Sequence, residues 1–189
     1  IVINPTFPQD EIDKAIPQII ASIKEEKSRS SSLAQALSRK CVYGFNHIYG
    51  QERKVEEVQS TKTSDLKEYY NLAIRPGSAS IAIVGDVNPK DVIKKIEDLF
   101  GSWKTGSAPK INVPSPSPAP PGIYFIERPA SVQSSLVIAY PAVALNHVDF
   151  HAQRMASNLL GGGFGGRLLK TLRETYSYTY TPGAFMSMA

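Results

Sequence analysis

Five glycines in six positions, residues 161–166, interrupt an otherwise helical pattern in NLLGGGFGGRLLKTLRETYSYTY. Glycine weakens a helix, so the run is unfavourable unless the backbone must turn sharply or lie close to another group. Behind it come a guanidinium, Arg173, and seven residues later a phenol, Tyr180. A guanidinium binds oxygen acceptors in a planar fork, and a phenol donates one hydrogen bond. From these residues alone, a surface ion pair of Arg173 with Glu174 or Glu127 is the simpler interpretation.

A histidine pair, His147 and His151 in NHVDFH, has the four-residue spacing of zinc ligands on one face of a helix. A peptidase built on paired histidines also needs a carboxylate base beside the metal-bound water. In the inverted motif H-x-x-E-H that base directly precedes the second histidine. Phe150 occupies this position, and Asp149 is expected to cap the helix start. We therefore interpret the pair as two half-exposed histidines and predict no catalytic zinc site in this chain.

Three other features are weak candidates for chemistry. GGGFGGR lacks the preceding strand and the following Lys-Ser/Thr of a phosphate-binding loop. His47 lies in a predicted loop without a second histidine nearby in sequence, so we interpret it as a structural histidine. Cys41 is the single cysteine, which excludes an internal disulfide and a multi-cysteine metal cage.

The composition is that of an ordinary soluble globular protein of 189 residues, with a formal net charge of +4 and a pI of about 9.1. Its basic residues are scattered and mostly lie beside Glu or Asp, so we expect no nucleic-acid partner. No apolar run approaches the ~20 residues of a membrane span. The chain begins without methionine and ends in a predicted strand, so we expect that both ends were cut from a longer protein.

Helices dominate the predicted elements of the first eighty residues. Thr6 and Gln9 resemble a capping box in front of a helix that carries a stripe of isoleucines. Pro17 lies inside this helix and predicts a kink, since it removes a backbone hydrogen bond. Two further helices are expected over residues 32–42 and 64–73.

The clearest pattern in the chain is a strand, a turn and a helix. Residues 80–84, SIAIV, are expected to form a buried strand. Asn88 should cap the following helix, with Pro89 at its first position and Gly101 at its end.

Residues 106–121 contain six prolines and little that could pack. We interpret them as an extended, semi-rigid linker; the alternative is a proline-rich ligand for another domain. The linker divides the chain into a first unit, residues 1–105, and the beginning of a second, residues 122–189.

Two strand patterns open the second unit, at residues 122–129 and 132–141. Helices are expected over residues 148–160 and 168–175, and a closing strand over residues 177–185. The chain is therefore predicted to have an α+β fold.

Taken together, these segments resemble the pitrilysin/insulinase family of zinc metallopeptidases, which includes the mitochondrial processing peptidase. YGFNHIYG is similar to the family's yG-x-x-H-P-Y-G, with Ile48 in place of the proline. RPGSASIAIVGDVNP and IEDLFGSW also resemble family segments, in the same order along the chain. The most specific likeness joins NLLGGGFGGRLLKTLRETYSYTY to n-x-i-L-G-G-g-f-x-s-R-L-x-x-x-L-R-E-x-x-G-Y-x-Y.

The resemblance implies units with an antiparallel sheet and helices, of which this chain would hold the second half of one and the first half of the next. Four such units, or two with a partner's two, would form a clam-like chamber around an extended peptide. The family's zinc lies on the H-x-x-E-H helix and a later glutamate of the first unit. An arginine and a tyrosine seven residues apart hold the substrate backbone near the metal; by resemblance these are Arg173 and Tyr180.

Two departures from the family pattern concern the metal and the tyrosine loop. H-x-x-E-H is absent, and Ser22 stands where active members carry the zinc-binding glutamate, although Glu25 and Glu26 are close. Ser177 replaces the glycine that precedes Tyr178. Zinc is therefore expected in the full-length enzyme or its partner, and no metal is expected in this chain.

The hypothesis is a zinc-dependent metalloendopeptidase, a hydrolase in which this chain supplies the substrate-clasping wall and is inactive alone. Its partners would be a peptide substrate and a metal-bearing N-terminal domain or partner subunit, in a homo- or heterodimer. The alternative is a non-catalytic scaffold subunit of the same fold; the presence of Arg173 and Tyr180 favours the peptidase. The compartment stays open, periplasm or cytoplasm if the protein is bacterial.

Overall fold

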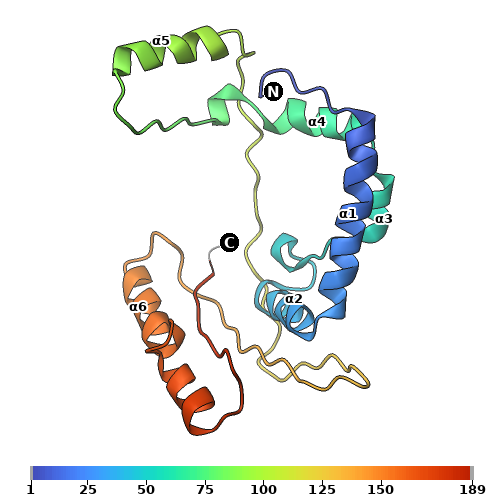
Figure 1. Ribbon diagram of the computed structural model, residues 1–189, viewed down its shortest axis with the longest axis vertical. Helices are drawn as coiled ribbons and strands as arrows, with labels where there is room; N and C mark the ends of the chain where they lie inside the picture. The colour runs from blue at the N-terminus through green and yellow to red at the C-terminus, as the bar shows by residue number, and fades with distance from the viewer. Residues whose placement is uncertain (1, 188–189) are drawn as a thin grey trace. The chain divides into compact units, whose positions relative to one another are not determined.

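The computed structural model describes residues 2–187 as helices joined by irregular segments (Figure 1). The α-helices are α1 Gln9–Ser28, α2 Ser30–Tyr43, α3 Val55–Ser60, α4 Thr63–Ala73, α5 Pro89–Phe100 and α6 Phe150–Gly161. Three short helical turns are η1 Ile48–Gly50, η2 Pro76–Ser78 and η3 Leu169–Thr175.

The prediction of an α+β fold with an antiparallel sheet is wrong, since residues 2–187 contain no strand. The four segments predicted as strands, residues 80–84, 122–129, 132–141 and 177–185, are irregular, and many of their apolar side chains are exposed. An alternating apolar pattern indicates that a segment suits a pleated surface, but a strand forms only where a second backbone pairs with it. Among the described residues none of the four segments pairs along its length with a second backbone as a strand; the segment 177–185 makes one such bond, from the Ala184 amide to the Gly161 carbonyl (3.3 Å).

Helix α1 begins two residues later than a Thr6 cap would place it. Its N-cap is Pro8, without a side-chain hydrogen bond, so the predicted capping box of Thr6 and Gln9 is absent. The Gln9 amide instead donates to Asp13 (2.8 Å) and accepts from the Thr63 hydroxyl at the start of α4. The side chain of Gln9 therefore joins two helices and does not cap its own.

Apolar side chains of α1 form part of the local hydrophobic core. Ile12 and Ile23 are buried, and α1 packs against α3. Beside this contact the Arg53 guanidinium pairs with the Glu26 carboxylate at 2.7 Å. Pro17 lies inside α1, as predicted from the sequence.

Helices α2, α4 and α5 confirm three of the predicted helices. The prediction for α5 holds in detail: the Asn88 side chain accepts a hydrogen bond from the Lys90 amide (3.0 Å), Pro89 is the first helical residue and Gly101 is the C-cap. An N-cap side chain satisfies a backbone donor that has no partner within the helix.

The described chain forms two compact units that are each built from several stretches of sequence. The first comprises Ile1–Ala36, Gln51–Ser115 and Ile123–Leu136. The second comprises Leu37–Gly50, Pro116–Gly122 and Val137–Ala189. The division into residues 1–105, 106–121 and 122–189 remains a prediction.

The proline-rich segment has no regular structure over residues 104–120. Its last part is nevertheless attached to the end of α2. The Ser117 amide donates to the Tyr43 carbonyl (2.9 Å), and the Ala119 amide donates to the Cys41 carbonyl (2.8 Å). These bonds satisfy carbonyl groups that a helix leaves without an internal partner at its C-terminal end.

Candidate functional site

The glycine run is the turn between α6 and η3. Gly163 has a φ of +70°, in the left-handed region that only glycine adopts without strain. Gly161, at the end of α6, accepts a hydrogen bond from the Ala184 amide (3.3 Å), and a Cβ at Gly161 would collide with that amide nitrogen. The run therefore uses two properties of glycine. Gly163 turns the chain, and Gly161 lets the backbone of Ala184 approach closely.

Arg173 lies on η3, which is π-helical over Leu169–Thr175. Leu169 is buried and fastens the start of this element. At its end the Tyr176 amide donates to the Thr171 carbonyl (3.1 Å), five residues back, and the Tyr178 amide donates to the Leu172 carbonyl (2.8 Å). π-helical turns are rare in proteins, and those that occur often lie at functional sites. The prediction of a helix here is confirmed, with a different hydrogen-bond pattern.

The structure brings Arg173 and Tyr180 together. The guanidinium carbon of Arg173 lies 4.0 Å from the centre of the Tyr180 ring, a cation–π contact. Arg173 is half-buried, whereas Tyr180 is 72% exposed. Among the described residues, Arg173 forms no ion pair with Glu174. The two residues that the motif paired are therefore in contact in the structure.

This geometry allows two kinds of hydrogen bond to a ligand. A guanidinium that stacks by its face keeps its N–H groups in the plane for oxygen acceptors. The Tyr180 hydroxyl makes no hydrogen bond within residues 2–187 and can donate to a further oxygen. Both groups bind and polarise; neither is placed beside a base that would make it a nucleophile.

Close to Arg173 and Tyr180 in the sequence lies a pair of stacked aromatic rings that the motifs did not predict. Tyr176 and Tyr178 stack with ring centres 5.3 Å apart and planes inclined by 10°. Between them Ser177 has a φ of +54°, and its amide donates to the Arg173 carbonyl (3.1 Å). The replacement of a family glycine by Ser177 was the available signal, since that position takes a glycine conformation.

The two histidines of NHVDFH do not share a helical face. His147 precedes α6, which begins at Phe150, and only His151 is helical. The Asp149 amide donates to Nδ1 of His147 (3.2 Å), and the Asp149 carboxylate lies 3.7 Å from the same nitrogen. Asp149 is the N-cap residue but makes no side-chain cap bond. The interpretation of the pair as structural fits this geometry.

His47 is a buried member of an aromatic cluster. Its ring stacks on Tyr43 at 5.5 Å and lies 5.3 Å from the ring of Tyr49. Nδ1 of His47 accepts a hydrogen bond from the Tyr49 amide (3.1 Å). These contacts support the reading of His47 as a structural residue.

The described residues do not fit a zinc ion. In residues 2–187, no three His, Cys, Asp or Glu side chains gather as metal ligands would. Ser22, which the sequence comparison by motif predicted to stand in place of a zinc-binding glutamate, accepts from the Arg53 guanidinium (3.5 Å), which also binds Glu26. We therefore derive no chemical step of this chain through a metal.

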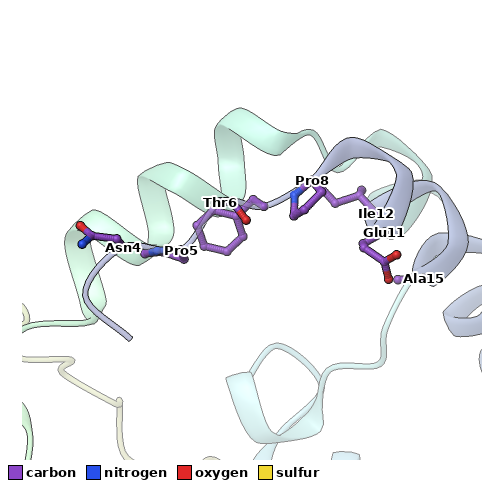
Figure 2. A pocket seen from close by; sticks show the side chains of 8 residues that line it. Asn4, Pro5, Thr6, Pro8, Glu11, Ile12 and Ala15 are labelled. Carbon is purple, nitrogen blue, oxygen red and sulfur yellow. The ribbon is translucent and has the colours of Figure 1, made fainter. Parts of the chain in front are cut away.

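A hollow of about 520 Å³ lies beside the first turn of α1 (Figure 2). It is lined by residues 4–8 together with Glu11, Ile12 and Ala15, and most of this lining is apolar. The Glu11 carboxylate at its rim pairs with Lys14 at 2.7 Å. The hollow offers shape but no convergent set of catalytic groups, and it contains neither Arg173 nor Tyr180.

No helix of residues 2–187 is both long and apolar enough to cross a lipid bilayer.

Comparison with known families places the chain among zinc-peptidase relatives. Residues 62–189 match the family described as the peptidase M16 inactive domain, and the chain belongs to that family. The match extends over the helices and irregular segments from α4 to the end of the chain and includes Arg173 and Tyr180. The identification made from the motifs is thereby confirmed.

Two curated relatives are each described as an uncharacterised zinc protease. The protein of Rickettsia felis is 23% identical over an alignment of 192 residues that covers 99% of this chain and 45% of the relative. The protein of Rickettsia bellii is 23% identical over 193 residues, with the same coverage. The chain thus spans less than half the length of the relatives that it matches.

A solved structure from Pseudomonas fluorescens, described as a peptidase M16 inactive domain, has a similar fold. It superposes with a TM-score of 0.78 at 24% sequence identity, over 95% of this chain and 44% of that one. At this identity the likeness concerns the fold alone.

Proposed function

We propose that this chain supplies a substrate-binding wall of a zinc-dependent endopeptidase, with Arg173 and Tyr180 holding the backbone of an extended peptide. The metal would belong to a metal-bearing N-terminal domain or partner subunit. The observation that carries the proposal is the Arg173–Tyr180 contact at 4.0 Å, directly after the glycine turn, in a chain of a peptidase family.

The chemistry of the pair suits a peptide better than a compact ligand. Peptide carbonyl oxygens recur along an extended backbone, and a planar guanidinium can bind two neighbouring acceptors. A phenol hydroxyl can donate to the oxygen on which negative charge develops during peptide hydrolysis. Stacking on Tyr180 restricts the Arg173 guanidinium in advance, which lowers the entropy lost when a peptide binds.

The test is peptide cleavage by the full-length protein, or by the complex with its metal-bearing partner. Tyr180→Phe keeps the ring under Arg173 and removes only the hydroxyl, and we expect kcat/KM to fall by about 10²–10³-fold. Arg173→Ala should lower it by a comparable factor. Arg173→Lys should rescue little, since an ammonium lacks the planar fork.

Arg154→Ala is the matched control, because Arg154 is an exposed cation of α6 in the same unit and has no part in the proposed site. Cleavage at the normal rate by both Arg173→Ala and Tyr180→Phe would refute the assignment. Thermal unfolding is measured on each variant, because a large loss of stability would indicate a structural role and favour a non-catalytic scaffold.

A further inference from the structure

Next to the Arg173–Tyr180 contact, the face-to-face pair of Tyr176 and Tyr178 has no evident structural purpose. The rings are 56% and 76% exposed, although stacked aromatic rings gain most when they are buried. A stacked pair leaves an outer face on each ring, and both tyrosines are exposed. Such a surface is a binding platform for a third flat or apolar group.

The backbone holds this platform to the element that carries Arg173. Amides of residues 177 and 178 bond back to the carbonyls of Arg173 and Leu172, at 3.1 and 2.8 Å. Ser177, with a φ of +54°, makes the turn between the two stacked rings. The platform and Arg173 therefore belong to one hydrogen-bonded turn, and Tyr180, two residues further on, contacts Arg173.

The charged residues that precede the platform in the sequence favour some side chains of a bound peptide over others. Residues 167–174 carry Arg167, Lys170 and Arg173 against Glu174. An aromatic ring attracts cations, but these neighbours repel a lysine or arginine side chain. An uncharged aromatic side chain gains the ring contact without that repulsion.

We propose that Tyr176 and Tyr178 form a side-chain subsite that receives an aromatic residue of the peptide bound by Arg173 and Tyr180. The proposal rests on the proposed function and adds a preference to it: the backbone is held by the cation and the phenol, and one side chain is chosen by the stacked rings. An offset or edge-to-face contact with either exposed ring is the expected geometry.

The experiment uses a fluorescein-labelled peptide of alanine, serine and glycine in which a single phenylalanine is moved along the sequence. Matched peptides carry alanine or arginine at the same place. Dissociation constants from anisotropy, and kcat/KM from cleavage, are measured with the full-length protein or its complex. In one register we expect phenylalanine to bind about 2- to 10-fold more tightly than alanine, and arginine to gain nothing.

Tyr178→Ala should reduce the phenylalanine-to-alanine ratio to about one, whereas Tyr178→Phe should preserve it. Tyr140→Ala, which removes another exposed tyrosine of the same unit, is the control and should preserve the ratio. A ratio of one in every register for the unmodified protein, or an unchanged ratio in Tyr178→Ala, overturns the subsite.

Failure of the proposed function has a different signature. It would appear as normal cleavage of the alanine peptide by Arg173→Ala, whatever the phenylalanine-to-alanine ratio. The ratio in Tyr178→Ala decides the subsite separately, because it compares two peptides on one variant.

Discussion

Ser177 is the residue at which this chain departs most informatively from the pattern of its family. Its φ of +54° lies in a region where a side chain is strained, and where glycine is not. The strained residue separates the two stacked tyrosines and follows Arg173 by four positions. Strain of this kind persists where surrounding contacts impose it, as the bonds to the carbonyls of Leu172 and Arg173 do here.

Ser177→Gly should therefore raise the free energy of unfolding by about 0.5–1 kcal/mol, the gain from relieving a left-handed side chain less the added chain entropy of glycine. Urea unfolding of the purified protein measures it. Ser135→Gly is the control, because Ser135 is exposed and irregular but its φ is not positive. A loss of stability in Ser177→Gly equal to that in Ser135→Gly would contradict this account.

At the scale of elements, the glycine turn sets where η3 begins and thus where Arg173 lies. Two of its glycines make a matched pair. A Cβ would meet open space at both Gly163 and Gly165, but only Gly163 has a positive φ, of +70°. The two positions therefore have equal space for a side chain and differ in backbone conformation.

Gly163→Ala is expected to destabilise the protein by about 1 kcal/mol, because alanine is strained at positive φ. Gly165→Ala should be neutral or stabilise by up to about 1 kcal/mol, since it reduces the freedom of the unfolded chain. Thermal unfolding of the two variants side by side is the measurement. Equal effects would show that the turn is not set by the conformation of Gly163.

At the scale of the whole molecule, the proline-rich segment and the extent of the chain matter most. The chain covers 45% of each curated relative, so the activity of a complete protein is a proposal for this one. Within the chain, residues 104–120 are irregular, but only the last of them are attached to α2, through Tyr43 and Cys41. The segment therefore has two attached parts and a middle part. The Gly106 carbonyl accepts from the Gly77 amide (2.8 Å) and the Ala108 amide donates to the Ser78 hydroxyl (2.8 Å), and residues 109–113 take part in neither attachment.

Limited proteolysis should separate these parts and test the predicted division of the chain. A protease must draw an extended backbone into its own site, so first cleavage is expected at residues 109–113 or near the termini. Residues 116–120 and helix α5 should be cut later, because their backbones are hydrogen-bonded. Mass spectrometry of the earliest fragments identifies the sites. First cleavage within residues 89–100 would count against the division.

Local patterns predicted the helical elements and the candidate site of this chain. Helices α2, α4 and α5 were correct because every helical hydrogen bond closes within a few residues, as the cap of α5 at Asn88 illustrates. Arg173 and Tyr180 were found together by their spacing in a family motif, and both belong to one short turn. Family membership was likewise visible in short motifs that need no tertiary contact.

Features that depend on distant or conformational partners could not be derived in this way. The four apolar segments were predicted as strands, but a strand requires a second backbone, which the described residues do not provide. His147 was predicted to lie on a helix, but α6 begins only at Phe150. Thr6 was predicted as the N-cap of α1, but Pro8 is the N-cap residue. The stacking of Tyr176 on Tyr178 depends on the φ of Ser177, which no spacing rule predicts for a serine. Local hydrogen bonding is encoded along the chain, whereas pairing and stacking depend on which groups the folded backbone brings within reach.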